Sequence, residues 1–303
     1  MDVPAALPVG TLGARAYAKV NLYLEVLGRR PDGYHDVETV LQSVGLYDVL
    51  HFVPRPRGLS ILCDAPGVPA DEDNLCMRAA RALLQTAGHT DPPRGVRIDL
   101  YKNIPVAAGF GGGSADAAAT LVALDNFWNL GLGRDVLVKL AKDLGADVPF
   151  CLQGGTALGK GRGNLLTPFP GIHQTWFLIV FPGLRVSSAW AYERLGMGLT
   201  RRAHALSMNR LRTILTRYPE AARGLFNRLE DAVCPAQPLV GEITSRLLQL
   251  GASAALMSGS GSGVFGAFRT EAEAEQARRE FGRTDWRMPI VPSIEKGVEL
   301  FGA

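Results

Sequence analysis

The stretch Pro105-Val-Ala-Ala-Gly109-Phe-Gly111-Gly112-Gly113-Ser114-Ala-Asp116 decides how this sequence is interpreted. It lies between residues 96–101, which alternate like a strand, and residues 114–126, which have helical spacing. Its four glycines let backbone N–H groups converge where Cβ atoms would otherwise stand. The helix that follows adds unpaired N–H groups and the positive end of its dipole. The stretch therefore predicts an anion site, most naturally for phosphate, with the Ser114 hydroxyl on the phosphate or on a bound Mg²⁺.

The alternative is a flexible loop in which Ser114 is an ordinary helix N-cap, but three adjacent glycines are costly in a mere connection. Two other glycine-rich stretches imitate nucleotide motifs. The run from Gly154 to Lys160 resembles a Walker loop, but Gly161 stands where a Ser or Thr is needed. Gly261-Ser-Gly263-Val-Phe-Gly266 matches a dinucleotide fingerprint, but residues 264–268 have a strand pattern where a helix is required. The wider segment 257–263 is interpreted as a tight turn between strands, which either closes over phosphates or simply joins a hairpin.

Composition indicates a globular protein and excludes several classes of function. The chain has 303 residues, is 47% hydrophobic, and carries 32 Lys plus Arg against 29 Asp plus Glu. A net charge of +3 does not call for a nucleic-acid partner. Four scattered cysteines, Cys63, Cys76, Cys151 and Cys234, form neither a disulfide framework nor a zinc motif. The N-terminus lacks a signal-peptide pattern, and the longest apolar run, 176–181, is too short to span a bilayer. We therefore expect a cytoplasmic protein without a membrane partner.

Strand and helix patterns are mixed in both halves of the chain without a strict βαβ alternation, which favours an α+β architecture with two domains. A linker at Pro168, Pro170 and Gly171 divides the chain into domains 1–167 and 168–303. Strands are expected at 14–27, 37–44, 49–53, 96–101, 176–181, 254–257 and 264–268, with a short hairpin in 156–166. Helices are expected at 74–87, 114–126, 134–144, 203–218, 237–250 and 271–281.

Three further segments carry candidate chemistry. In Ala18-Lys19-Val20-Asn21-Leu22, Lys19 and Asn21 share a strand face that continues to Tyr23 and Glu25; the alternative is a solvated polar face. In Leu144-Gly-Ala-Asp147-Val-Pro149-Phe150, apolar neighbours can desolvate Asp147 and make it a better base; the alternative is a turn or capping residue. In Gly28-Arg-Arg-Pro-Asp-Gly-Tyr34-His35, two rings can stack on a base and hydrogen-bond it; the alternative is a surface turn.

Together these segments, in this order and with Ser-Gly-Ser-Gly at 258–261, resemble the GHMP kinases over residues 16–268. Within that superfamily, the Arg29 to His35 segment is similar to the branch that acts on a cytidine diphosphate-linked methylerythritol in non-mevalonate isoprenoid synthesis. The resemblance implies an active site in the cleft between two domains, ATP as co-substrate and Mg²⁺. It implies no oligomeric state.

The same resemblance implies roles for individual residues. ATP would be bound by Pro105, Val106, Ala107, Ala108, Gly109, Phe110, Gly111, Gly112, Gly113 and Ser114, with Ser114 also a candidate Mg²⁺ ligand. Asp147 would take the proton from the substrate hydroxyl, and Lys19 would keep Asp147 ionised and stabilise charge on the reacting oxygen. Asn21, Tyr34 and His35 would contact the cytidine-bearing substrate, with Tyr192 stacked on cytosine. Gly259, Ser260 and Gly261 would belong to the family's third motif.

The sequence departs from the family pattern at four places. Ala107, Phe110 and Ala115 stand where Gly, Leu and Ser are usual, which predicts altered nucleotide affinity. Asn227-Arg-Leu-Glu230 departs from the usual Asn-Asp start, without an interpretation from the sequence. Two other hypotheses remain open: another superfamily kinase, acting on homoserine or mevalonate, and an inactive nucleotide-binding module. The rings at Tyr34, His35 and Tyr192 speak against the first, and the presence of both Lys19 and Asp147 against the second.

Overall fold

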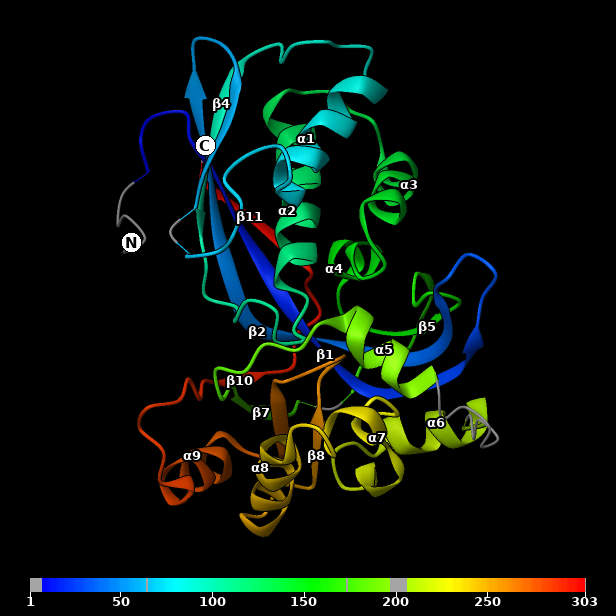
Figure 1. Cartoon of the computed structure of the whole chain (residues 1–303). Helices are drawn as coiled ribbons and strands as arrows, with labels where there is room; N and C mark the ends of the chain where they lie inside the picture. Colours follow the sequence, from blue (N-terminus) through cyan, green and yellow to red (C-terminus); the bar gives the residue numbers. More distant parts are fainter. Residues whose placement is uncertain (1–6, 64, 173, 197–205, 303) are drawn as a thin grey trace.

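The computed structural model describes residues 7–63, 65–172, 174–196 and 206–302. Two antiparallel-rich sheets, each covered by helices, build the molecule (Figure 1). The larger sheet and helices α1 to α4 form the upper part of the view, the smaller sheet with α8 and α9 forms the lower part, and α5 lies between them. The predicted α+β class with mixed elements in both halves is confirmed.

The larger sheet is built around two long paired strands, β1 (Leu12–Arg29) and β2 (His35–Arg55). Its strand order is β11-β1-β2-β4-β3. In addition, β5 pairs with β2 on one side and with β6 on the other. The other members are β3 (Leu59–Cys63), β4 (Gly95–Tyr101), β5 (Thr156–Lys160), β6 (Leu165–Pro168) and β11 (Val298–Gly302). The two short strands expected at 37–44 and 49–53 are one continuous strand, because Tyr47 and Asp48 keep pairing with Tyr17 and Ala16 of β1.

Small side chains allow helix α2 to lie close to this sheet. On β1, Ala14, Ala16 and Ala18 are fully buried and face the helical layer. Helix α2 (Gly112–Phe127) buries a run of alanines against them. Helices α1 (Leu75–Thr86), α3 (Arg134–Leu144) and α4 (Val148–Gln153) complete the layer. Asn74 caps α1 by accepting a hydrogen bond from the Cys76 backbone N–H at 2.9 Å.

The smaller sheet has the order β10-β7-β9-β8. Its strands are β7 (Trp176–Val180), β8 (Ala254–Met257), β9 (Val264–Phe268) and β10 (Ile290–Pro292). Around it lie α5 (Ser188–Gly196), α6 (Met208–Thr216), η1 (Ala222–Gly224), α7 (Glu230–Val233), α8 (Pro238–Gln249) and α9 (Glu271–Phe281). The expected helix at 203–218 corresponds to α6, and its residues 203–205 lie outside the described part. Residues 258–263 join β8 to β9 as the predicted turn, so the dinucleotide alternative is rejected.

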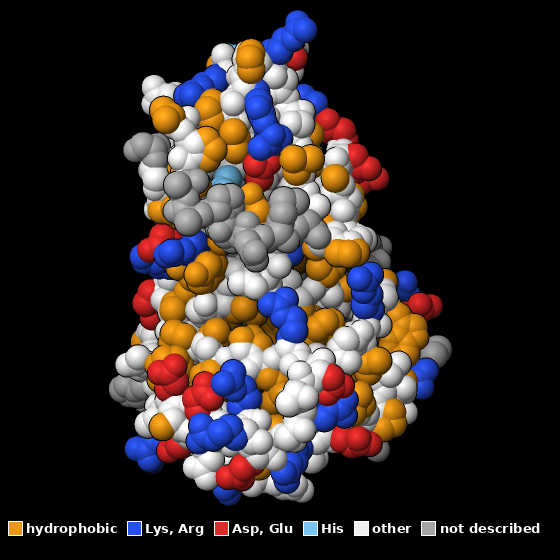
Figure 2. Space-filling view, turned by 90° about the vertical axis from the view of Figure 1, so that its left-hand side faces the viewer, with side chains coloured by type: hydrophobic (Ala, Val, Ile, Leu, Met, Phe, Trp, Pro, Cys, Tyr) orange, Lys and Arg blue, Asp and Glu red, His pale blue; other side chains and the backbone are white. Residues whose placement is uncertain are grey.

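The C-terminal strand β11 returns to the larger sheet and pairs with β1. The division into domains 1–167 and 168–303 stays a prediction; the last strand of the second segment belongs to the sheet of the first. The four cysteines are all free, as expected. Among the described residues, no helix is both long and apolar enough to cross a bilayer. On the face seen in Figure 2, Lys and Arg side chains are interspersed with Asp and Glu.

An ionic cluster fastens β11 to β1 and predicts a pH-dependent contribution to stability. Glu299 accepts hydrogen bonds from Lys296, from the Tyr17 hydroxyl at 2.8 Å and from Arg15 at 2.9 Å. These contacts, led by Lys296, lower the pKa of Glu299 to about 2 from an ordinary value of 4.5. Because the folded state favours ionised Glu299, the contacts of this carboxylate stabilise the fold fully above pH 4.5. Their contribution to the free energy of unfolding is lost as the pH falls toward 2.

We therefore expect Glu299→Gln to lower the free energy of unfolding at pH 7, by about 1 kcal/mol or less because the groups are partly exposed. The difference from wild type should shrink steadily between about pH 4.5 and 2. Thermal unfolding of both proteins across this range measures it, with Glu242→Gln, exposed on α8, as the control. A wild-type-to-variant difference independent of pH would contradict the assignment.

Candidate active site

A cavity of about 1030 Å³ brings most of the predicted site residues together. The residues from the glycine-rich stretch that line it are Pro105, Ala107, Ala108, Gly109, Phe110, Gly111, Gly112, Gly113 and Ser114. The other predicted residues that line it are Lys19, Asn21, Tyr34, His35, Asp147, Tyr192, Gly259 and Ser260. Val106 and Gly261 do not line it. Gly261 instead closes the turn, because its N–H donates to the Ser258 carbonyl at 3.0 Å.

The glycine-rich stretch forms a backbone loop that ends at the N-terminus of α2. Gly111 is the N-cap with φ +73°, so α2 begins at Gly112, and Ser114 is not the cap. Ala115 is fully buried in the helix and does not line the cavity, so a serine hydroxyl at this position would not face a bound nucleotide. The first turn of α2 therefore offers its free N–H groups to the cavity, as an anion site requires.

A buried ionic cluster, which no pattern in the sequence indicated, anchors this loop at its start and at helix α2. Lys102 donates to Asp48 and, at 2.6 Å, to Asp116 on α2. Asp48 also accepts from the backbone N–H groups of Asn103 and, at 2.8 Å, Ile104, where the loop begins. Burial disfavours the charge on Lys102, but the two carboxylates outweigh it and raise its pKa, so it remains an ammonium ion. Burial raises the pKa of Asp116 well above its usual range.

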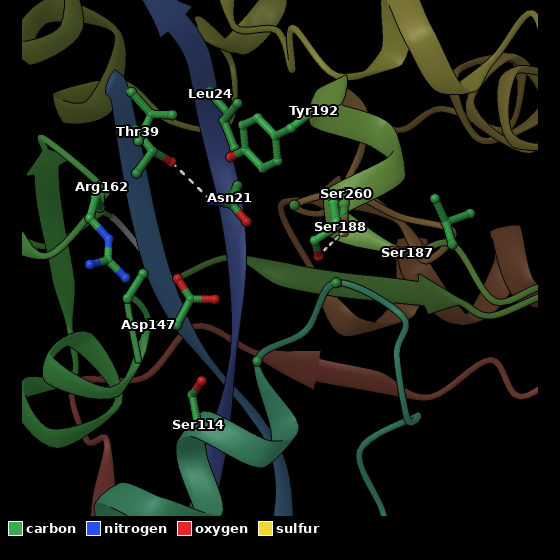
Figure 3. Close-up of a pocket in the computed structure, with 18 of the residues that line it drawn as sticks. Asn21, Leu24, Thr39, Ser114, Asp147, Arg162, Ser187, Ser188, Tyr192 and Ser260 are labelled. Atoms are coloured by element: carbon green, nitrogen blue, oxygen red, sulfur yellow. Dashed lines mark hydrogen bonds between the residues drawn. The ribbon is translucent and has the colours of Figure 1, made fainter. Parts of the chain in front are cut away.

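Lys19 and Asp147 meet at the centre of the cavity. The Lys19 Nζ lies 3.3 Å from Asp147 Oδ2, with side-chain exposures of 4% and 35%. Lys19 also donates to Asn21 Oδ1 at 2.7 Å, and Asn21 donates to Thr39 Oγ1 at 2.9 Å. In Figure 3, the Asp147 carboxylate lies between Ser114 at the start of α2 and Asn21 on β1. The ammonium is thus fixed by buried neighbours, while the carboxylate stays accessible to a ligand.

Irregular pairing of β1 with β2 aims these side chains. The register shifts between Tyr17 and Lys19 and again between Asn21 and Tyr23. Within this stretch the Lys19 N–H donates to the Phe110 carbonyl at 3.0 Å, which joins the strand to the glycine loop. Bulges of this kind re-aim side chains next to active sites. Lys19, Asn21, Tyr23 and Glu25 are all buried, so the alternative of a solvated face is wrong.

Asp147 is the N-cap position of α4, but its side chain makes no capping hydrogen bond. Its carboxylate therefore faces the cavity instead of serving the helix, which contradicts the alternative of a capping residue. Pro149 in the first turn of α4 fixes the backbone that presents it.

Aromatic rings gather at the other end of the cavity. His35 and Tyr192 are stacked, with ring centroids 5.1 Å apart and planes inclined by 24°. The guanidinium of Arg162 lies 3.6 Å from the centre of the Tyr34 ring. Burial and the Arg29 cation lower the pKa of His35, while burial and the charge of Asp147 raise that of Tyr192. Both rings are therefore uncharged near pH 7 and present flat apolar faces.

Several lining residues were not foreseen from the sequence. Among them are Arg29, Thr39, Arg162, Ser187, Ser188 and Glu193. Ser188 lies in the first turn of α5 and its hydroxyl is 2.8 Å from that of Ser260. Among the charged lining residues, Lys19, Arg29 and Arg162 are cationic and Asp147 and Glu193 acidic. With the N-terminal ends of α2 and α5 also facing it, the cavity favours an anionic ligand.

This arrangement is that of a phosphotransferase: a backbone cradle for phosphates, one fixed ammonium and one accessible carboxylate in a shared cavity. The family model "GHMP kinases N terminal domain" matches residues 74–155, and "GHMP kinases C terminal" matches residues 211–286. Together they cover just over half of the chain. A homoserine kinase structure from Cytophaga hutchinsonii, at 18% identity, has the same fold, with a TM-score of 0.74 over 99% of this chain and 100% of that one.

More similar proteins narrow the class. 4-Diphosphocytidyl-2-C-methyl-D-erythritol kinase of Syntrophus aciditrophicus is 42% identical over 92% of this chain and 98% of its own length. The kinase of the same name from Synechococcus sp. (strain JA-2-3B'a(2-13)) is 46% identical over 87% of each chain. A crystal structure of 4-(cytidine 5'-diphospho)-2C-methyl-D-erythritol kinase is 35% identical, with a TM-score of 0.79 over 93% of this chain and 98% of that one. The chain is an enzyme that belongs to the 4-diphosphocytidyl-2-C-methyl-D-erythritol kinase family of the GHMP kinases.

Ala107 in the glycine-rich loop carries a conformational strain that a substitution can release. Its φ is +54°, in the left-handed region that disfavours a Cβ atom, and its side chain is exposed. Ala107→Gly should therefore raise the free energy of unfolding by about 0.5–1 kcal/mol, even after the larger entropy loss of glycine.

Urea denaturation measures this effect, with Ala82→Gly in the middle of α1 as the control. The control should lose about 0.5–1 kcal/mol, because its backbone is helical. Equal destabilisation by both substitutions would show that Ala107 is not strained.

Proposed function

We propose that this enzyme transfers the γ-phosphoryl group of ATP to the 2-hydroxyl of 4-diphosphocytidyl-2-C-methyl-D-erythritol, with Asp147 as base and Lys19 as its charge partner. The observation that carries the proposal is the 3.3 Å contact between Lys19 and Asp147 beside the loop at the start of α2. A hydroxyl held against Asp147 would face phosphates bound at that loop. Family membership supports the substrate, since the named relatives carry it in their names.

The proposed mechanism depends on positioning and charge. Asp147 Oδ accepts the proton of the substrate hydroxyl as that oxygen attacks the γ-phosphorus, and ADP leaves. The Lys19 ammonium stabilises negative charge that develops on the reacting oxygens, without needing to move, because Asn21 holds it. Phosphoryl transfer needs little covalent assistance from the protein, so these two groups with the loop N–H groups suffice on the protein side.

Mg²⁺ fits this site as a metal held mainly by ATP. Among the described residues, no group of three or more His, Cys, Asp or Glu side chains could hold a metal ion. Mg²⁺ is commonly bound by substrate phosphates, waters and one or two protein oxygens. The Ser114 hydroxyl, which lines the cavity at the start of α2, is the protein oxygen we propose. When bound, the metal would neutralise phosphate charge.

The cytidine end of the substrate would lie among His35, Tyr192 and Tyr34. Two uncharged stacked rings suit a flat pyrimidine, and the neutral imidazole of His35 can donate or accept a hydrogen bond with its edge. The Nε2 of His35 is buried and makes no hydrogen bond to the described residues, so it is available for this role. Arg29 and Arg162 supply positive charge near these rings for a diphosphate.

Substrate choice is tested by coupled ADP release with ATP and Mg²⁺. We expect turnover with 4-diphosphocytidyl-2-C-methyl-D-erythritol and none with homoserine or mevalonate, which have no base to stack. Turnover of homoserine or mevalonate instead would overturn the substrate assignment, and no turnover despite ATP binding would favour the inactive module.

Asp147→Asn should lower kcat by about 10²- to 10⁴-fold while ATP still binds, because the amide keeps the shape and loses the base. Steady-state turnover and calorimetric ATP titration measure the two properties. Asp143→Asn, exposed on α3, is the matched control and should retain kcat. Full activity of Asp147→Asn would remove Asp147 from the mechanism.

Tyr192→Leu should raise KM for the cytidyl substrate roughly 5- to 150-fold, since stacking on a base is worth about 1–3 kcal/mol. The KM for ATP should not change. Trp190→Leu, on the same helix but not lining the cavity, should alter neither value. Equal increases in both KM values for Tyr192→Leu would indicate general damage to the site.

A further inference from the structure

Residues 226–230, which include the segment left unexplained by the sequence, connect the two walls of the active site. On one side they pair with β1: the Leu24 N–H donates to the Phe226 carbonyl at 2.9 Å, and the Arg228 N–H donates to the Leu24 carbonyl at 2.8 Å. Arg228 also forms a two-pronged ion pair with the buried Glu25, at 2.8 and 2.9 Å. The segment is thus attached to the strand that carries Lys19.

On its other side the segment holds the end of β8 and the turn that follows. Asn227 is 2% exposed, and its Nδ2 donates to the Met257 carbonyl at 2.8 Å and to the Gly259 carbonyl at 2.7 Å. Its Oδ1 accepts from the Leu229 N–H at 3.0 Å. Glu230 accepts from the Met257 N–H at 2.6 Å. Both donor hydrogens of the Asn227 amide therefore serve one purpose, which is to fix the backbone from Met257 to Gly259.

Gly259 in turn lies directly against the proposed reaction centre. A Cβ atom at Gly259 would lie 3.3 Å from Lys19 Nζ, 3.5 Å from Asn21 Oδ1 and 3.2 Å from the Gly109 carbonyl. The two residues that flank Gly259 contact other walls of the cavity. Ser258 Oγ donates to the Gly109 carbonyl at 2.9 Å, and the Ser260 hydroxyl forms a hydrogen bond with that of Ser188. A displacement of Gly259 would either press on the ammonium or leave space for it to move.

We propose that Asn227 is a positioning residue for phosphoryl transfer, which holds Gly259 against Lys19 and so fixes the Lys19 ammonium beside Asp147. The inference rests on the proposed role of Lys19. Asn227 does not line the cavity, so it acts through Gly259 and not on the substrate. Misplacement of a catalytic group by about 1 Å can cost about 10²-fold in rate. Loss of Asn227 therefore affects the reacting state more than the binding of either substrate.

The first test is a kinetic comparison of two variants in the same segment. Asn227→Ala should lower kcat at least about tenfold, with KM for ATP and for the cytidyl substrate within about threefold of wild type. The matched control is Arg228→Met, which removes the ion pair with Glu25 and leaves the contacts to Met257 and Gly259. It should lower the melting temperature and keep kcat within about twofold.

The second test does not depend on turnover. The chain has only six lysines, so lysine labelled with ¹³C at Cε gives few NMR signals, and Lys19→Arg identifies that of Lys19. Asn227→Ala should shift the Lys19 signal, and Arg228→Met should not. If the enzyme turned over none of the substrates, the proposed function would fail while this measurement still decided the role of Asn227.

Both tests are made below the unfolding temperature of every variant, and Asn227→Ser replaces Asn227→Ala if the latter does not fold. An unshifted Lys19 signal, an unchanged kcat, or equal losses of kcat in the Asn227 and Arg228 variants would overturn the proposal. A shifted signal with a selective loss of kcat would support it.

Discussion

The active site depends on direct contact between two backbone segments, 108–110 and 258–263, that are about 150 residues apart in the sequence. A Cβ atom at Gly109 would lie 1.9 Å from the Ser258 carbonyl oxygen, and one at Gly263 would lie 2.3 Å from the Phe110 ring. The Gly263 N–H donates to the Ala108 carbonyl at 3.1 Å across the same contact. Only glycine leaves space for so close an approach. Because Lys19 bonds to Phe110 and lies against Gly259, this contact also determines where the ammonium is.

Charge is distributed around that contact in two layers. Below the loop, Lys102 is enclosed by Asp48 and Asp116, which tie the start of the loop and the start of α2 to the larger sheet. Above it, Lys19 is held by Asn21 and lies beside the more exposed Asp147. Separating Lys102 from Asp48 and Asp116 would leave a buried charge without a partner, which is strongly destabilising. This cluster therefore keeps the start of the loop and the start of α2 in place. The upper layer leaves the carboxylate accessible, which is what a reacting group requires.

Local patterns predicted much of the fold and of the site. Alternation located β1 and β4, apolar strand patterns located β7, β8 and β9, and helical patterns located α1, α2, α3, α8 and α9. Residues of all four candidate segments line one cavity. The adjacent glycines at 111–113 were the strongest single signal, and the other three segments gained their interpretation from the resemblance to the GHMP kinases. The catalytic roles of Lys19 and Asp147 stay predictions.

What local patterns could not predict depends on contacts between distant residues. The return of β11 to β1 has no local signal, because five residues in a strand conformation pair wherever an open edge is available. Strict alternation could not foresee the register shifts around Lys19 and Asn21. Arg162 follows a glycine in a hairpin and looks like a surface residue until Tyr34 lies beneath it. Asn227 has meaning only through Met257 and Gly259, which lie 30 and 32 residues further along the chain.

The most direct test of this account is a crystal structure of the enzyme with a non-hydrolysable ATP analogue, Mg²⁺ and 4-diphosphocytidyl-2-C-methyl-D-erythritol. We predict the γ-phosphate analogue at the loop before α2 and the 2-hydroxyl within hydrogen-bonding distance of the Asp147 carboxylate. The cytosine should lie against Tyr192, with Lys19 unmoved beside Asp147. An acceptor hydroxyl out of reach of Asp147, or triphosphate bound away from the glycine loop, would contradict the account.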